Sequence, residues 1–192
     1  LSPFSGVFDG NGRTISNFHY VSTDVDVNEA AIFLCVQGEQ ARITDLGLID
    51  PVIVVDSNEL DIYVDPDDPN SGAIYGNTAG ALVNYLSNGA LLSRCYVRGG
   101  SISGDTRVGG LVSNVRTGTI DNCYSATEVS GGRQIGGLAG YSDWGTITDC
   151  HSTSKITGES IAGGLVGGND GTIQNFHAAG DVTCESTAGG LA

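Results

Sequence analysis

The sequence has few positive charges. Lysine and arginine together number 8, against 22 aspartates and glutamates, and the formal net charge is −14 at pH 7. Nucleic-acid binding requires clustered Lys and Arg to neutralise phosphates, and binding to an anionic membrane surface requires them too. The charge balance argues against both kinds of partner.

Long apolar runs are also missing. No stretch approaches the roughly 20 apolar residues that a membrane-spanning helix needs, so no membrane insertion is expected. The chain opens at Leu1 in patterned sequence, without a signal peptide, and stops at 190–192 within a motif. We therefore expect a fragment of a longer chain, whose remainder is one of its partners.

Methionine is absent and lysine occurs once, whereas glycine occurs 30 times. Glycine at this density is unfavourable for a helical protein. Apolar residues nevertheless recur regularly along the whole chain, which argues against disorder. The composition therefore favours an ordered protein built from strands and turns.

A repeat of about 27 residues is the strongest feature. A Gly-Gly-Leu motif and a weaker Gly-Ala-Leu copy place leucines at 82, 111, 138, 165 and 191, in steps of 29, 27, 27 and 26 residues. A second motif follows each copy and reads Thr-Ile-Asp-Asn-Cys-Tyr at 119–124, with related versions at 146–151 and 172–177. Aligned on this second motif, the chain holds six units, which we place at Ile15, Ile43, Leu92, Ile120, Ile147 and Ile173.

Each unit contains three short apolar patches separated by Gly, Asn, Asp and Ser, which is turn chemistry. Three short strands with turns fill about 27 residues and close one coil of a solenoid whose coils stack at ~4.8 Å. We predict an all-β fold, a right-handed parallel β-helix (β-solenoid) of six to seven coils, forming one domain over 1–192. A leucine-rich repeat would need a helical segment, and a propeller blade needs ~40 residues or more. An acidic loop at 56–76 is predicted to interrupt the coils.

A polar position inside the second motif marks a bend. Ile120 and Cys123 are three residues apart, so both can face inward only if the strand bends, and Asn122 tolerates the left-handed backbone that such a bend needs. The corresponding residues in the other units are short and polar except Arg94, which the bend alone does not explain.

The motifs carry a family resemblance. The run 163–167 with Asn169 and 171–173, the Asn-Cys-Tyr at 122–124 and the opening 8–16 resemble the bacterial GLUG repeat. The resemblance implies a part of a large secreted or surface-anchored bacterial protein, a class that includes adhesin-like proteins and immunoglobulin A-cleaving metallopeptidases. It implies a stalk or binding platform rather than a catalytic unit, and the sequence contains no His-Glu-x-x-His.

Acidic residues gather in two segments that the alignment places on neighbouring coils. One segment begins at Asp24 and the other, from Asp56 to Asp68, has no base within it. Carboxylates on adjacent turns suit Ca²⁺, although a solvated acidic loop is the simpler interpretation and a cationic or polysaccharide ligand is a third. The candidate calcium ligands are Asp24, Asp26, Asp61, Asp65, Asp67 and Asp68.

Cys95, Cys123 and Cys150 occupy one repeat position, which indicates a buried apolar column of reduced thiols because apolar residues fill it in the other units, namely Phe18, Leu46 and Phe176. Cys184 is expected in a turn, as the more exposed thiol. The cysteines show no Cys-x-x-Cys spacing, so the sequence does not predict a metal cluster.

Aromatic and basic side chains supply candidate ligand contacts. The position after the cysteine column carries Tyr96, Tyr124, His151 and His177, a stripe that can pack against sugar rings or merely stack on an outer face. The alignment also places His19 in this stripe. Arg107 and Arg133 lie in one turn on adjacent coils, with Asp105 nearby.

The sequence therefore predicts a structural or interaction module of a bacterial extracellular or cell-surface protein, with a polysaccharide or a host or cell-surface protein as partner. The alternative is a polysaccharide-binding module or a carbohydrate-active enzyme, a lyase or hydrolase, that uses the acidic loop and the neighbouring arginines. An ice-binding role would need a flat threonine array, and the chain offers one threonine column, at 14, 119, 146 and 172. No cofactor is expected other than Ca²⁺.

Overall fold

The computed structural model describes residues 2–24, 29–56 and 76–192. Over these ranges the secondary structure consists of β-strands, and no helix there is long and apolar enough to cross a membrane. The strands are β1 (Val7–Ser16), β2 (His19–Ser22), β3 (Glu29–Ala30), β4 (Phe33–Gln37), β5 (Arg42–Ile49), β6 (Val52–Val55), β7 (Thr78–Gly80), β8 (Val83–Ser87), β9 (Leu91–Ser93), β10 (Tyr96–Gly109), β11 (Val112–Arg116), β12 (Thr119–Asp121), β13 (Tyr124–Gly136), β14 (Ala139–Asp143), β15 (Thr146–Thr148), β16 (His151–Ser152), β17 (Lys155–Gly163), β18 (Val166–Asn169), β19 (Thr172–Gln174), β20 (His177–Ala178), β21 (Val182–Cys184) and β22 (Thr187–Gly189).

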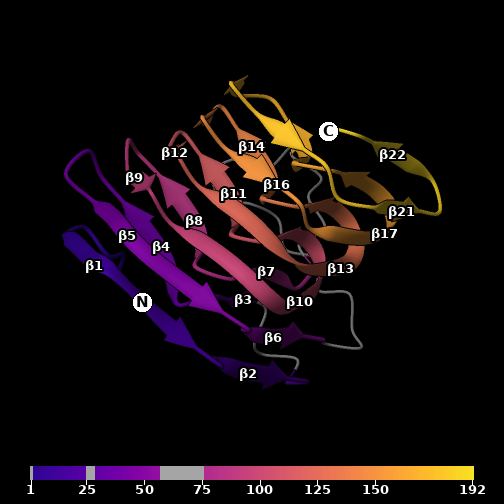
Figure 1. Cartoon of the computed structure of the whole chain (residues 1–192), viewed down its shortest axis with the longest axis horizontal. Coiled ribbons are helices and arrows are strands. Elements are labelled where there is room, and N and C mark those ends of the chain that lie inside the picture. Colours follow the sequence, from indigo (N-terminus) through magenta and orange to yellow (C-terminus); the bar gives the residue numbers. More distant parts are fainter. Residues whose placement is uncertain (1, 25–28, 57–75) are drawn as a thin grey trace.

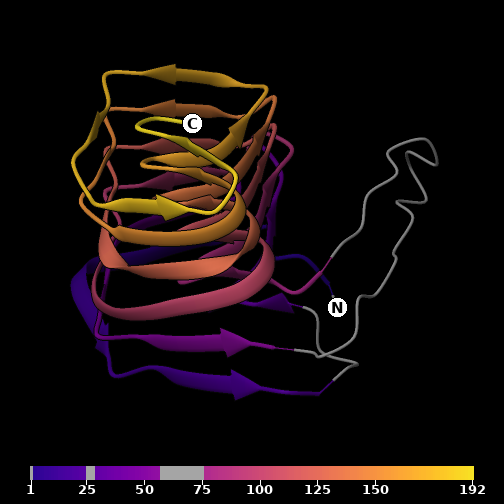
Figure 2. The ribbon, with the colours of Figure 1, turned by 90° about the vertical axis from the view of Figure 1, so that its right-hand side faces the viewer.

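Strands one repeat apart lie side by side and pair in parallel. On one side the order is β1, β5, β9, β12, β15 and β19, and on the next it is β2, β6, β10, β13, β17 and β21. A separate five-stranded sheet, with the order β18-β14-β11-β8-β4, forms another wall. Figures 1 and 2 show the resulting stack, with the first strands at one end and the last strands at the other. The fold is all-β and resembles a β-helix.

The apolar repeat positions fill the interior. The pairing places Ile43, Leu92, Ile120, Ile147 and Ile173 in one column, as the second motif predicts. The motif leucines form another column, in which the backbone N–H of each of Leu82, Leu111, Leu138 and Leu165 donates to the carbonyl of the next leucine. These four leucines are completely buried. Burial of such columns is the main favourable term in the stability of the stack.

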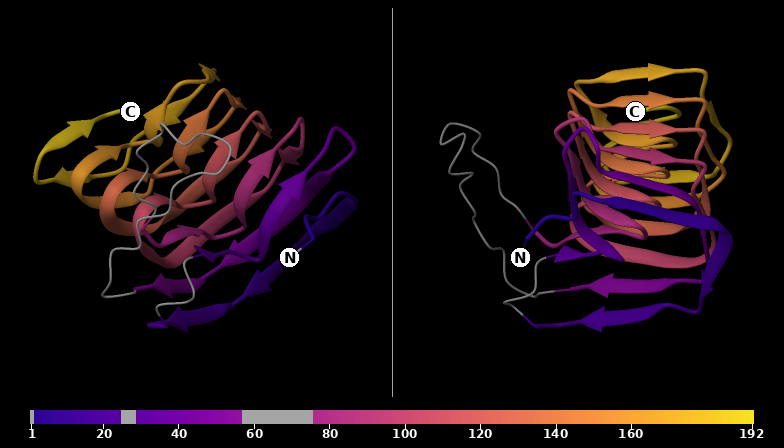
Figure 3. Two further views of the ribbon diagram at one scale, coloured as in Figure 1. Left: turned by 180° about the vertical axis from the view of Figure 1, so that it is seen from behind. Right: turned by 90° about the vertical axis from the view of Figure 1, so that its left-hand side faces the viewer.

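The Gly-Gly pair before Leu138 is required by close approach of neighbouring coils. A Cβ on Gly137 would lie 2.1 Å from the Ser152 Oγ and 2.3 Å from the Gly164 carbonyl oxygen. A Cβ on Gly136 would lie 1.9 Å from the carbonyl oxygen of Ala139. Only glycine leaves room for this backbone. The views in Figure 3 show how closely the coils follow one another.

The predicted bend is present in five consecutive units. Asp45, Arg94, Asn122, Asp149 and Asn175 all have a positive φ, between 50° and 55°. The Arg94 side chain at this bend is held in place by an ion pair with Asp45 on the preceding coil. Its Nε and Nη2 donate to the two carboxylate oxygens of Asp45 at 2.7 and 2.6 Å. This bidentate pair is the strong form of an arginine–carboxylate contact, and it lowers the pKa of Asp45.

The first unit was aligned wrongly from the sequence. Phe8 pairs with Ile43, whereas Ile15 pairs with Leu48. The cause is a register shift between Asp9 and Arg13, where β1 holds two more residues than β5. As a result His19 pairs with Val52 and stands outside the aromatic stripe.

The predicted insertion falls between β6 and β7. Asp56 is exposed beside the end of β6, and its N–H donates to the Ser22 carbonyl at 3.0 Å. Gly76 is buried just before β7. The rest of 56–76 lies outside the described residues, so its role as an acidic loop stays a prediction.

Candidate functional site

The aromatic stripe lies on the outer face, where β10, β13, β16 and β20 begin. Tyr96 pairs with Tyr124, Tyr124 with His151, and His151 with His177. The residue before each of the four is at the cysteine position, where Cys95, Cys123 and Cys150 are buried and Phe176 is 45 % exposed. Because side chains alternate along a strand, the next one points outward. The structure therefore brings together Tyr96, Tyr124, His151 and His177, and of the predicted stripe residues only His19 stands apart.

The rings of the stripe stack on one another. The Tyr96 and Tyr124 centroids are 4.8 Å apart with a 2° angle between planes, and Tyr124 and His151 are 5.0 Å apart at 8°. Tyr96 also covers Gly47, where a Cβ would lie 2.3 Å from its ring. Partial burial raises the pKa of Tyr124, with a further contribution from Tyr96. Both faces of the Tyr124 ring are thus occupied, so a sugar could reach only ring edges here.

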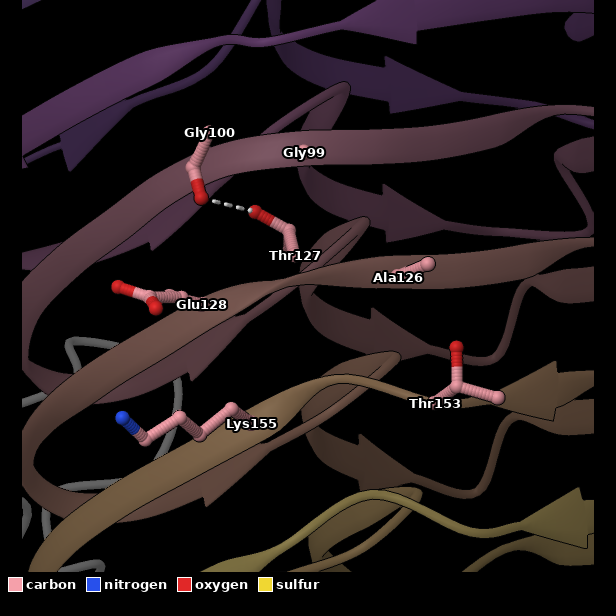
Figure 4. A pocket seen from close by; sticks show the side chains of 7 residues that line it. All are labelled: Gly99, Gly100, Ala126, Thr127, Glu128, Thr153 and Lys155. Carbon is pink, nitrogen blue, oxygen red and sulfur yellow. Dashed lines mark hydrogen bonds between the residues drawn. The ribbon is translucent and has the colours of Figure 1, made fainter.

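A shallow depression of about 460 Å³ lies beside the stripe. Gly99 and Gly100 open it, because both have a positive φ and interrupt the pairing of β10 with β13. The Thr127 hydroxyl donates to the carbonyl of Gly100 on the adjacent coil at 3.0 Å (Figure 4). The lining residues are Gly99, Gly100, Ala126, Thr127, Glu128, Thr153 and Lys155.

Charged side chains border this depression. Glu128 pairs in register with Lys155, the sole lysine, and both side chains extend outward from neighbouring strands in Figure 4. Arg98, also exposed, pairs with Ala126 at the opposite rim. The arrangement offers hydrogen-bond donors and acceptors to a polar ligand.

The two predicted arginines take different positions. Arg107 is half-buried, with its guanidinium carbon 5.0 Å from the Tyr141 ring centroid and its Nε donating to Gln134 Oε1 at 3.3 Å. Arg133 is exposed and pairs with Thr106. The two therefore share a turn but occupy different columns, and the Arg107 side chain packs against Tyr141 of β14.

Most of the candidate calcium ligands lie outside the described residues. Asp24 is described and exposed, and its N–H donates to the Ser22 Oγ at 3.2 Å. Within the described ranges no three His, Cys, Asp or Glu side chains are grouped to hold a metal ion. The calcium site therefore stays a prediction. The ligands that fall outside are Asp26, Asp61, Asp65, Asp67 and Asp68.

A carboxylate line near the root of the insertion was not predicted. Asp105 is two residues past Ser103, and Asp56 is two past Val54, the partner of Ser103. Burial raises the pKa of Asp105, and the charges of Asp56 and Glu159 raise it further. Asn77 opposes the shift by donating its Nδ2–H to Asp105 Oδ2 at 3.0 Å. The sequence signal was available, since residues 56 and 105 stand at the same distance from the paired residues Val54 and Ser103, although Asp56 follows β6 and Asp105 lies within the longer β10.

The cysteine column is buried as predicted. Cys95, Cys123 and Cys150 are at most 2 % exposed, and all five cysteines are free. The N–H of Cys95 donates to the Cys123 sulfur at 3.3 Å, and Cys123 repeats this contact with Cys150 at 3.4 Å. Burial raises the pKa of Cys123 well above its ordinary value, so this thiol is inert. Cys184 ends β21 instead of lying in a turn, so that part of its prediction was wrong, but it is half-buried, like Cys35, and thus more exposed than the column thiols.

Comparison with known proteins agrees with the repeat pattern. The family model of the GLUG motif matches residues 131–157, from β13 into β17. A crystal structure from Bacteroides ovatus, of a protein proposed to be an immunoglobulin A1 protease, is similar with a TM-score of 0.51 and 16 % identity. The match covers 94 % of this chain and 68 % of that one. At such low identity the likeness concerns the fold alone. No curated protein matches the sequence significantly.

Proposed function

We propose that this GLUG-motif chain is a structural and interaction module, a stalk or adhesin-like binding platform, of a large bacterial extracellular or cell-surface protein. In this proposal it forms one domain, a right-handed parallel β-helix of six to seven coils, with the 56–76 segment as an acidic side loop. Its partner is a polysaccharide or a host or cell-surface protein, and the GLUG motif together with the similar fold supports the extracellular location.

The observation that carries the proposal is the parallel pairing that continues from β1 to β22. Among the described residues, each coil is hydrogen-bonded to the next. The apolar columns continue through the stack, so the buried side chains of each coil pack against those of the adjacent coil. Such a one-dimensional array is stiff along its axis and presents its outward side chains at regular spacing. These are the properties of a spacer that displays binding residues.

Binding without turnover tests the proposal. The purified chain is immobilised and exposed to a panel of polysaccharides and to extracellular-matrix proteins, while reducing ends and unsaturated products are measured in the same solutions. We expect retention of at least one panel member and product formation at the level of buffer. Turnover, or retention of none of them, would contradict a binding platform.

A second candidate function, a glycoside hydrolase or lyase, is favoured by the aligned carboxylates of Asp56, Asp105 and Glu159. A carboxyl group with a raised pKa can act as a general acid in glycoside hydrolysis, and burial beside two charges raises that of Asp105. If the chain is such an enzyme, Asp105→Asn abolishes product formation while the fold is retained. Asp149→Asn, an exposed carboxylate change at the bend where other units carry Asn122 and Asn175, is the matched control and leaves turnover intact.

A further inference from the structure

Trp144 has no structural reason to be a tryptophan. It is the only one in the sequence and is 74 % exposed. Burying an indole removes a large apolar area from water, and that stabilisation is forgone here. The ring follows β14 at the corner that leads to β15.

The backbone at Trp144 is also unfavourable for a bulky side chain. Its φ is 57°, in the left-handed region. The same corner on the preceding coils is occupied by Thr117, with φ 58°, and by Asn88, with φ 52°. Antiparallel bridges from Arg116 to Trp144 and from Ser87 to Thr117 identify the corners as equivalent. Asparagine suits this conformation, whereas a large side chain in it costs about 1 kcal/mol or more.

The residues next to Trp144, in sequence and across the antiparallel bridge, are charged and contact each other. Arg116 Nε lies 3.7 Å from Asp143 Oδ2, directly before the ring in sequence. The Tyr141 hydroxyl donates to Asp170 on the next coil. This contact and burial raise the pKa of Tyr141 to about 12, so the phenol stays protonated. The corner therefore places an exposed indole directly after Asp143 in sequence and opposite Arg116, its partner in the antiparallel bridge.

We propose that Trp144 is the stacking plate of a site for an uncharged glycan, with Arg116 and Asp143 as hydrogen-bonding partners of its hydroxyl groups. A pyranose ring has an apolar C–H face that packs on an aromatic ring and a rim of hydroxyls that pair with planar carboxylate and guanidinium groups. The nearby carboxylates and the −14 charge disfavour an anionic sugar. This inference rests on the proposed platform function and names its ligand class.

A protein partner fits this corner less well. Protein hot spots sit within a patch of about 800 Å² per partner, where surrounding contacts exclude water. Among the described residues, the other large exposed apolar side chains lie in or beside strands at the two ends of the stack, away from Trp144. They are Val7, Phe8, Val21 and Phe176. An isolated ring between charged groups matches one sugar residue better than a protein surface.

The sole tryptophan makes the site directly observable, because all tryptophan emission comes from Trp144. The purified chain is titrated with cellohexaose, xylohexaose, mannohexaose and chitohexaose, and with asialofetuin before and after enzymatic deglycosylation. We expect one of the oligosaccharides to shift the emission to shorter wavelength and to reduce quenching by acrylamide. No shift with any probe would overturn the proposal, and so would a shift that survives deglycosylation of asialofetuin.

Variants separate this site from other surfaces. By calorimetry, Trp144→Ala weakens glycan binding about tenfold or more, whereas Phe176→Ala, which removes another exposed ring, leaves the affinity unchanged. Trp144→Asn likewise loses binding but raises the unfolding temperature, because Asn suits the left-handed corner. Wild-type affinity in Trp144→Ala would overturn the proposal.

The outcomes also distinguish this proposal from the platform function. Glycan binding that persists in Trp144→Ala but disappears when Tyr96 and Tyr124 are both changed to Ala would assign the ligand to the stripe, and the platform would stand. Cleavage of any probe would instead contradict the platform itself.

Discussion

Gly137→Ala adds one methyl group between two coils and should destabilise the protein strongly. Its Cβ would lie 2.1 Å from the Ser152 Oγ and 2.3 Å from the Gly164 carbonyl oxygen. The serine can rotate, but the carbonyl belongs to the backbone of the next coil. That carbonyl must retreat by about 0.7 Å to reach even 3.0 Å, a distance below which real Cβ atoms are essentially never found.

The magnitude follows from what the retreat disturbs. Overpacking a close-packed interior costs typically 1–3 kcal/mol. The Gly137 N–H donates to the Gly163 carbonyl at 3.3 Å, and the Gly164 N–H donates to the Gly189 carbonyl at 3.0 Å. Separating the coils weakens both bonds, each worth about 1 kcal/mol. We expect a loss of roughly 2–4 kcal/mol in the free energy of unfolding.

Gly190→Ala is the matched control, because Gly190 has the same place in the Gly-Gly-Leu motif but no atom within 4 Å of its added Cβ. Its effect should stay within about 0.5 kcal/mol. Urea unfolding followed by far-ultraviolet circular dichroism measures both, with equal slopes required for the comparison. Similar free energies for the two variants, or a neutral Gly137→Ala, would refute the argument that coil approach selects glycine.

Two other expectations concern ionisable groups. The pKa of Asp105 is raised in the folded state, so the contribution of Asp105 to wild-type stability falls as pH rises from the ordinary carboxyl pKa through the raised value. Asp105→Asn removes that fall and makes the protein more stable at pH 7 than the wild type, as thermal unfolding across pH 3–7 would measure; equal profiles would contradict the shift. Thiol titration without reductant should count five thiols in denaturant, and in the native protein the two half-buried ones react before the three fully buried ones. Fast native reaction of Cys123 would contradict its inert environment.

The interior was predictable because its residues repeat with the coil. Ile120 and Ile147 pair as their spacing requires, and the motif leucines stack as their steps require. The alignment of the first unit was wrong because it was based on a short motif match at Ile15. It took no account of the two extra residues that β1 holds after Asp9. A local irregularity of this kind changes register without changing composition, so spacing alone does not reveal it.

The candidate site was only partly predictable. The stripe was found because its residues share a column and a residue type. Trp144 was missed because it occurs once and stands at a corner where the neighbouring units carry Thr and Asn, so no repetition marks it. The ion pair of Arg94 with Asp45 could not be predicted from spacing. The direction of the Arg94 side chain depends on the positive φ of the bend, which spacing does not give.

The direction of the backbone hydrogen bonds gives the protein an anisotropic response to force. Bonds between coils run along the stack axis, so tension applied at the two ends loads one ladder at a time and peels the outermost coil first. Each detached coil of about 27 residues releases roughly 90 Å of extended chain. A protein built this way lengthens in equal steps under pull and absorbs work at each one, while a sideways load is shared by many coils.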